Sequence, residues 1–364
     1  MTSLMSTKRK RTRVALLAFF GLTVLSFGLI TLIKLPYTSK IPHPPESQNP
    51  SSPVRDQISE AWAKARRFPS GENLGMLGMV YHSSANYAQA AQCYQLAVKR
   101  NSSAWIWDYY LAYLNLEMGN SQEVITHFNS VVEKNPAVSH AWYYLGEQYR
   151  NLRENELAEQ SFTKIISIQG TLSPGNQTSR YDYFPLGTYA MYQLARLYMD
   201  SDRLDLAERT LEEVIQKHRS FGPAYRLLSH IYRMKGDTSL SKRYGVRAND
   251  LVVFSPPVDT LVDRLVLLSR SELYLLKKID EAEKSIYPEW AMKLVKHAMQ
   301  YMPENPYLIS KAIRICLMSG LDEQASSYTD QHLDFYRDNF TEMNNMGILF
   351  FQKRMYPQSM KYLG

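Results

Sequence analysis

The chain has 364 residues, of which 12% are aromatic, including 26 tyrosines. Its net charge is +7, but five positive charges lie within residues 8–13, which leaves about 7 − 5 = +2 for the rest. That balance gives no support for nucleic-acid binding, and the spacing of Cys93, Cys316 and the histidines matches no metal or covalent haem motif. We therefore expect no nucleic-acid partner, no metal and no cofactor.

The N-terminal 34 residues predict a membrane anchor. Residues 1–13 form a basic tail, and Val14 to Ile33 is a run of 20 uncharged residues. A helix of this length crosses a hydrocarbon core of about 30 Å, so we expect a transmembrane signal-anchor over residues 14–34. The positive charges before the run predict a cytoplasmic N-terminus. The alternative is a cleaved signal peptide, which the length of the run and the lack of a small-residue cleavage site disfavour.

Two short segments follow the predicted anchor. Residues 35–54 are rich in Pro, Ser, Gln and Asn, a composition that cannot bury a core. We expect them to be a linker that lifts the rest of the chain off the membrane. Residues 55–70 carry Ile58, Trp62 and Ala65 at helical spacing and predict a capping helix.

The stretch from 139 to 172 has the pattern of two amphipathic helices joined by a turn. Residues at i, i+3, i+4 and i+7 share one face of the first helix, and a similar set follows in the second: Trp142, Leu145, Gly146 and Tyr149, then Ala158, Phe162 and Ile165. A small residue recurs every 34 positions, at Gly78, Ala112 and Gly146. This pattern resembles the tetratricopeptide repeat (TPR), although Gly170 stands where that family has its closing Pro.

The resemblance implies an all-α fold, a right-handed superhelical solenoid of helix-turn-helix units behind one N-terminal transmembrane helix. We expect repeats 1–3 over residues 71–172 and repeats 4–5 over residues 188–255. An irregular sixth repeat is expected over 256–305, and a seventh with a partial eighth over 306–364. No polar closing helix follows, which predicts either that the last helix packs on a partner or on another copy of this chain, or that the chain is truncated.

Residues 173–187 interrupt the array and predict an inserted loop, because Gly, Pro, Ser and Asn break any helix there. Its aromatic residues Tyr181, Tyr183 and Phe184 could form a binding finger. The alternative is a loop that folds back over the edges of the repeats.

The resemblance also implies where a partner would bind. In the family, the first helices of successive repeats line a concave groove, and their inward positions fall here on Tyr109, Tyr113, Tyr143, Glu147, Arg150, Tyr189, Tyr192, Arg196, Arg226, His230 and Arg233. This groove would be aromatic at one end and basic at the other. It suits an extended segment with an apolar half and an acidic half. The alternative is a merely solvated concave face.

The sequence favours a membrane-tethered scaffold that binds protein partners on the extracytoplasmic side, with the bacterial periplasm as the favoured compartment. We expect no enzymatic activity, because the repeats leave no room for a catalytic domain and no nucleophile, acid pair or phosphate loop stands out. The alternative is the non-catalytic repeat portion of a larger envelope enzyme or assembly factor, in a secretion, cell-wall or electron-transfer complex.

Overall fold

The structure is a computed structural model that describes residues 38–45, 52–169, 184–251, 254–284 and 288–364. Within these ranges the regular elements are helices and no strand occurs. In chain order the helices are α2 (Ser52–Arg67), α3 (Gly71–His82), α4 (Tyr87–Arg100), α5 (Trp105–Met118), α6 (Ser121–Lys134), α7 (Ser139–Asn151), α8 (Asn155–Gln169), α9 (Leu186–Asp200), α10 (Leu204–Lys217), α11 (Gly222–Met234), α12 (Thr238–Asn249), α13 (Thr260–Leu268), α14 (Glu272–Glu283), α15 (Pro288–Met299), α16 (Pro306–Ser319), α17 (Asp322–Ser327), α18 (Thr329–Tyr336), α19 (Phe340–Gln352) and α20 (Tyr356–Leu363).

Helices α3 to α12 form five consecutive hairpins, and in the first and third of them a glycine in the first helix faces an aromatic ring in the second. A Cβ added at Gly78 would lie 2.6 Å from the Tyr94 ring, and one at Gly146 would lie 2.6 Å from the Phe162 ring. Ala112 is fully buried at the corresponding place in the second hairpin. The absence of a side chain therefore lets two helices approach closely around an aromatic ring.

The fifth hairpin, α11–α12, replaces this packing by hydrogen bonds. Ser229 Oγ donates to the carbonyl of Ser241 at 2.8 Å, and Ser241 Oγ donates to the carbonyl of Ser229 at 2.8 Å. The small residue has moved to the second helix, where a Cβ on Gly245 would lie 3.2 Å from Ser229 Oγ. Ser229 and Gly245 thus stand 16 residues apart, like Gly146 and Phe162, but without the large side chain in the second helix.

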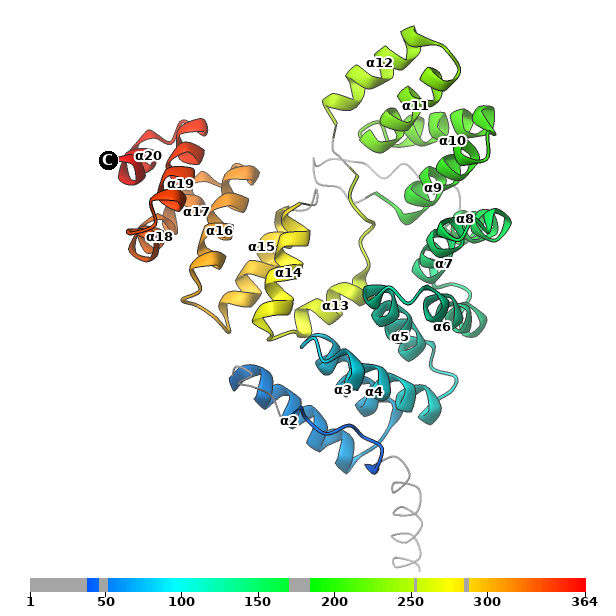
Figure 1. Ribbon diagram of the computed structural model, residues 1–364, viewed down its shortest axis with the longest axis horizontal. Coiled ribbons are helices and arrows are strands. Elements are labelled where there is room, and N and C mark those ends of the chain that lie inside the picture. Colours follow the sequence, from blue (N-terminus) through cyan, green and yellow to red (C-terminus); the bar gives the residue numbers. More distant parts are fainter. Residues whose placement is uncertain (1–37, 46–51, 170–183, 252–253, 285–287) are drawn as a thin grey trace, which may run out of the picture.

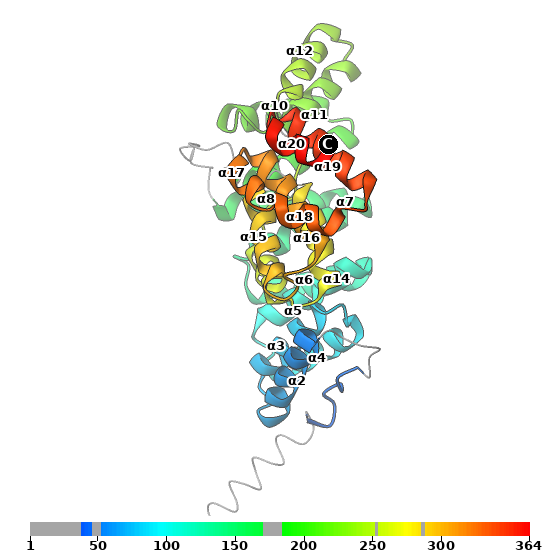
Figure 2. The ribbon, with the colours of Figure 1, turned by 90° about the vertical axis from the view of Figure 1, so that its left-hand side faces the viewer.

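The helices form two arms that diverge from a common base (Figure 1). The first arm is α3–α12, and the second arm is α14–α20, which ends at the C-terminus; in the perpendicular view α14 lies level with α5, and both arms extend toward the same end of the molecule (Figure 2). Helix α13 joins them. Its Leu265 belongs to the core of the first helices, whereas the adjacent Val266 belongs to the core of the second arm.

Helix α2 and the preceding residues 38–45 pack against the start of the first arm. Ile58 and Ala65 of α2 are buried, as is Ile41. The carbonyl of Pro42 accepts hydrogen bonds from Trp62 Nε1 at 3.0 Å and from the Tyr81 hydroxyl at 3.1 Å. Part of the proline-rich stretch is therefore held against the repeats.

Several expectations fall outside the described residues. The apolar run of residues 14–33 is among them, and within the described ranges no helix is both long and apolar enough to cross a bilayer. Tyr181 and Tyr183 also lie outside, whereas Phe184 is buried with its ring 4.9 Å from that of Phe221. Phe184 thus packs into the first arm.

The end of the second arm exposes apolar side chains on α19 and α20. Phe351, Met360 and Leu363 are each at least half exposed. Self-association through this surface stays a prediction.

Candidate partner-binding site

The concave side of the first arm is partly filled by the chain itself. After α12 the chain runs back between the two arms to α13, and we call residues 254–259 the crossing segment (Figure 1). Figure 1 also shows α5, α7 and α9 on the side of the first arm that faces the second arm, with α6, α8 and α10 behind them. The crossing segment therefore lies where a bound peptide is expected in such an array.

Asp259 anchors the crossing segment. Its carboxylate accepts hydrogen bonds from the hydroxyls of Tyr109 and, at 3.0 Å, Tyr144. The same carboxylate caps α13 by accepting from the backbone N–H groups of Leu261 at 3.0 Å and Val262 at 3.3 Å. Asp259 is only 6% exposed, and its four donors compensate the cost of burying a charge.

Further contacts fix the same region. His140 Nε2 lies 2.8 Å from the carbonyl of Val258, and the Tyr110 hydroxyl donates to the carbonyl of Leu261 at 3.1 Å. At the end of α13, Ser269 Oγ donates to the carbonyl of Ser83 at 2.6 Å. These bonds join residues that are more than 100 positions apart, and they fix α13 against the first arm.

Two predicted groove residues therefore meet the chain's own atoms. Tyr109 is fully buried, and burial together with the Asp259 carboxylate raises the pKa of its hydroxyl. Tyr113 borders a cavity between the arms, with its ring 6.0 Å from Lys278 Nζ. The sequence placed both residues on the concave face but gave no sign that a later segment covers it.

A second group of predicted residues forms a polar chain between α7 and α9. Gln193 Nε2 donates to the Tyr143 hydroxyl at 3.1 Å and to Glu147 Oε1 at 3.0 Å. Arg196 Nη1 donates to Gln193 Oε1 at 3.1 Å. Burial raises the pKa of Glu147 despite the hydrogen bond from Tyr143 and the nearby arginines. The structure thus brings Tyr143, Glu147 and Arg196 together through Gln193, which the sequence analysis did not single out.

The remaining predicted residues lie along α7, α9 and α11. Tyr192 stacks on Phe254 of the crossing segment at 5.7 Å, and Tyr189 contacts the same ring edge-on at 6.0 Å. The other four are cationic or titratable. Arg150 pairs with Asp200 at 3.4 Å, and Arg226 donates to the carbonyl of Leu251 at 3.1 Å. His230 is half-buried, and Arg233 is exposed. We call Arg150, Arg196, Arg226, His230 and Arg233 the basic wall.

A buried ionic network connects the two arms. Glu117 of α5 accepts from Lys278 Nζ of α14 at 2.7 Å and lies 2.9 Å from His82 Nε2. Lys278 also pairs with Glu281 at 3.1 Å. Burial alone would raise the pKa of Glu117, but the hydrogen bond from His82 and the charge of Lys278 lower it to about 2. Glu117 is therefore a carboxylate at neutral pH.

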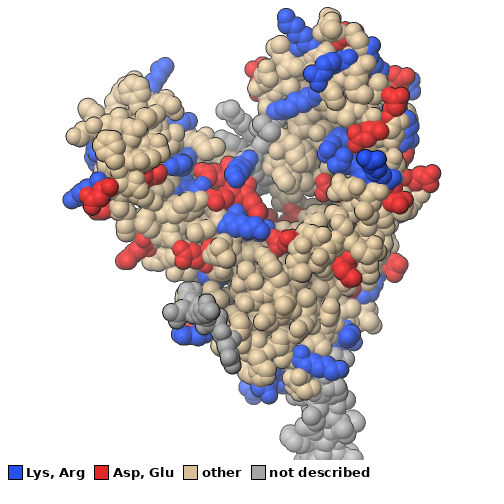
Figure 3. Space-filling view, viewed as in Figure 1, with Lys and Arg blue, Asp and Glu red and all other residues tan. Residues whose placement is uncertain are grey.

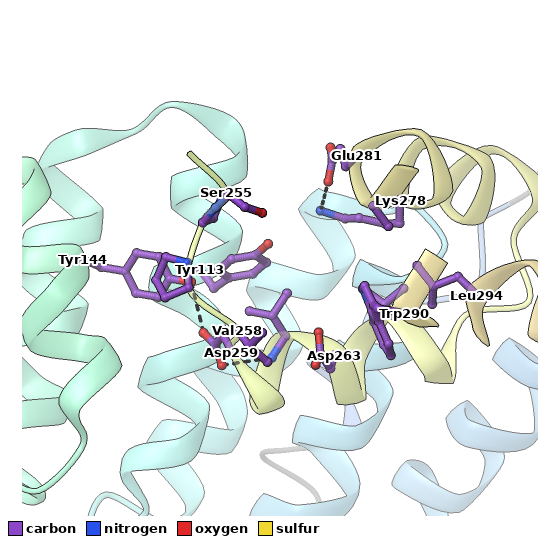
Figure 4. Close-up of a pocket in the computed structure, with 15 residues that line it drawn as sticks. Tyr113, Tyr144, Ser255, Val258, Asp259, Asp263, Lys278, Glu281, Trp290 and Leu294 are labelled. Carbon is purple, nitrogen blue, oxygen red and sulfur yellow. Dashed lines mark hydrogen bonds and ion pairs between the residues drawn. The ribbon is translucent and has the colours of Figure 1, made fainter. Parts of the chain in front are cut away.

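The cavity at this junction has a volume of about 230 Å³. Figure 4 shows its walls, which come from α5, α7, the crossing segment and helices α13–α15. In the space-filling view, charged side chains of both signs gather where the arms meet (Figure 3). Among the described residues no cluster of His, Cys, Asp and Glu is arranged to hold a metal ion.

Family models identify the repeats. Two models, both described as tetratricopeptide repeat, match residues 76–125 and 189–220. The chain contains tetratricopeptide repeats. The matched ranges contain all of α4, α5 and α10 and most of α9, and they agree with the hairpins described above. No curated protein matches the chain.

Solved structures similar to this TPR protein share little sequence with it. A crystal structure of MamA is 18% identical, covers 48% of this chain and 93% of its own, and has a TM-score of 0.41. YrrB, described as a TPR protein with an unusual peptide-binding site, is 16% identical, covers 53% and 91%, and has a TM-score of 0.42. MamA from Desulfovibrio magneticus RS-1 is 12% identical, covers 55% and 96%, and has a TM-score of 0.39.

Proposed function

We propose that this TPR protein is a non-catalytic scaffold that holds an acidic segment of a protein partner against its basic wall. The observation that carries the proposal is the wall itself. Five side chains that are cationic or can become so lie on three successive inner helices, and Glu147 and Asp200 are the carboxylates among their described contacts. Positive charge repeated along a concave face suits an extended acidic partner.

The crossing segment supports the same mode of binding. It is an extended stretch with two prolines, and its aspartate is held by tyrosine hydroxyls of the inner helices. The inner helices of the first repeats thus bind an extended segment of the same chain through its one carboxylate. The basic wall lies further along the same array, beyond the Phe254 ring that packs on Tyr192. An external segment would continue along the face where the internal one ends.

A peptide-binding experiment tests the proposal. Fluorescence anisotropy would follow the binding of a labelled ten-residue peptide rich in Asp and Glu, with a Lys-rich peptide of equal length as the negative probe. Because screening shortens the reach of charge to about 8 Å at physiological ionic strength, affinity for the acidic peptide should fall as salt is added. We expect Arg196→Glu and Arg233→Glu each to weaken binding by about tenfold, equivalent to about 1.4 kcal/mol.

The matched control is Arg209→Glu on α10, an exposed arginine of the outer helix layer. It makes the same change of charge away from the inner helices and should leave the affinity unchanged. If the three variants bind equally well, the basic wall is not the binding surface.

We further propose that residues 14–34 tether the scaffold to a membrane, with the repeats on the extracytoplasmic side and the bacterial periplasm as the favoured compartment. The basic cluster before the apolar run supports this orientation. We also propose that the repeats follow the right-handed superhelical course that is typical of the family. A reporter enzyme that is active only outside the cytoplasm, fused after Gly364, should be active. A silent reporter would reverse the orientation.

A further inference from the structure

We propose that the cavity between the arms is a binding pocket for a cationic group, an ammonium or a guanidinium of the kind that lysine and arginine side chains carry. The pocket is distinct from the basic wall and opposite to it in charge. The proposal rests on the proposed function only for the source of the cation, a protein partner. Figure 4 shows the walls of the pocket, which are lined among others by Tyr113, Ser255, Asp259, Asp263, Glu281 and Trp290.

The charge of the lining is negative. Three carboxyl groups, on Asp259, Asp263 and Glu281, face one cation, Lys278. Lys278 is already engaged by Glu117 at 2.7 Å and by Glu281 at 3.1 Å. Its charge is therefore not available to balance the other carboxyl groups of the lining. An anionic ligand would meet uncompensated repulsion here, and a cationic one would be attracted.

Asp263 carries the excess charge. The Asp259 carboxylate accepts from two tyrosine hydroxyls and two backbone N–H groups, but the carboxyl group of Asp263 makes no hydrogen bond or ion pair with any residue that the structure describes. Burial first, and then the charge of Asp259, raise the pKa of Asp263 to about 6. Lys293 opposes this shift but is not among the lining residues. A bound cation would relieve the repulsion between the two carboxyl groups.

Ser255 is the independent sign of a ligand. Its side chain is 4% exposed, yet its Oγ has no hydrogen-bond partner among the described residues. Figure 4 shows this side chain at the cavity, above the Tyr113 ring. Buried hydroxyls are nearly always hydrogen-bonded in native proteins, so an unpaired one at a cavity indicates a missing partner. An N–H of an ammonium or guanidinium would donate to this oxygen.

The aromatic lining fits the same chemistry. The rings of Tyr113, Tyr144 and Trp290 border the cavity together with the aliphatic Val262, Val266 and Leu294. Aromatic faces attract alkylammonium and guanidinium groups, and apolar walls accommodate the methylene stem that carries them. The volume of about 230 Å³ accommodates one such side chain rather than a folded element. The pocket thus selects one cationic residue of the partner.

NMR titration with defined small molecules tests the proposal. The probes are Nα-acetyl-lysine methylamide, the corresponding arginine compound, and the uncharged norleucine compound of similar shape. The readout is the indole N–H signal of Trp290, assigned by its loss in Trp290→Phe. We expect both cationic probes to shift this signal saturably, with dissociation constants on the order of millimolar, and the norleucine probe to leave it unmoved at the same concentrations.

Two variants complete the experiment. Asp263→Asn should weaken lysine binding by about fivefold to tenfold, because it removes a charge-assisted contact. It should not unfold the protein, because Asp263 has no pairing to lose within the described structure. Glu304→Gln, an exposed position on the second arm that does not line the pocket, is the control and should change nothing.

The outcomes separate this pocket from the basic wall. Equal shifts with lysine and norleucine, or unchanged affinity in Asp263→Asn, would overturn the cationic pocket. Binding of the acidic peptide to the wall should survive Asp263→Asn undiminished, and binding of the lysine probe should survive Arg233→Glu. Each proposal can therefore fail while the other stands.

Discussion

Removal of Lys278 should loosen the junction between the two arms. The substitution Lys278→Met keeps an unbranched side chain that is one atom shorter and deletes the charge. It leaves Glu117, whose side chain is 8% exposed, with His82 as its one remaining close partner among the described residues. Glu117 belongs to the first arm and Lys278 to the second arm. The substitution therefore removes an ion pair that holds the two arms together.

The magnitude follows from the burial and the pKa of Glu117. Breaking a buried ion pair by removing one partner costs about 3–5 kcal/mol. The pKa of Glu117 falls from 4.5 to about 2, and this difference of about 2.5 units corresponds to about 3 kcal/mol at 1.36 kcal/mol per unit. Because His82 remains, we expect the lower end, about 3 kcal/mol. The double variant Glu117→Gln with Lys278→Met leaves no unpaired charge and should cost roughly 1 kcal/mol.

Urea unfolding followed by circular dichroism measures these losses, and small-angle X-ray scattering measures the separation of the arms. The radius of gyration of Lys278→Met should exceed that of the wild type. Lys217→Met is the matched control, because Lys217 pairs with Glu213 on the surface of one helix and such a pair contributes only about 0.2–0.5 kcal/mol. The cycle is completed by the single variant Glu117→Gln. If the losses of unfolding free energy in Glu117→Gln and Lys278→Met add up to the loss in the double variant, Glu117 and Lys278 are not coupled and the reasoning is refuted.

Three further results are expected. Gly146→Ala places a methyl group 2.6 Å from the Phe162 ring and should lower the unfolding free energy by about 1–3 kcal/mol, and by clearly less in a Phe162→Leu background. The depressed pKa of Glu117 contributes stability that is complete above about pH 4.5 and lost as pH falls toward 2; acid unfolding of Glu117→Gln should lack this component. Asp259→Ala removes the acceptor for Tyr109 and should speed amide hydrogen exchange across residues 254–268, whereas unchanged exchange there would contradict its anchoring role.

The hairpins could be predicted from the sequence because their determinants are local. The partners Gly78 and Tyr94, like Gly146 and Phe162, are 16 residues apart, within one repeating unit. Inner positions such as Tyr143 and Arg196 also follow from the repeat, because each inner helix presents the same positions to the concave side. The membrane anchor, by contrast, concerns residues that the structure does not describe.

The crossing segment could not be predicted, because its contacts join distant parts of the chain. Tyr109 and Asp259 are 150 positions apart, and Glu117 and Lys278 are 161 apart. Neither pair can be recognised from the periodicity of the sequence. The nearest signals were the break at Pro256–Pro257 and the apolar stretch after it, which lacks the Gly or Ala landmarks of a repeat. Both indicated that the array is interrupted there, but not where the next helix docks.

The long-range anchoring by Asp259 has a consequence for synthesis of the protein. Most repeat arrays become stable as each unit leaves the ribosome, since a unit contacts only its neighbours. Here Tyr109 of the second unit gains its carboxylate partner only when Asp259, 150 positions later, has been synthesised, a delay of roughly 8–30 s at typical elongation rates of about 5–20 residues per second. During that interval the hydroxyls of Tyr109 and Tyr144 lack the acceptor that they have in the folded protein.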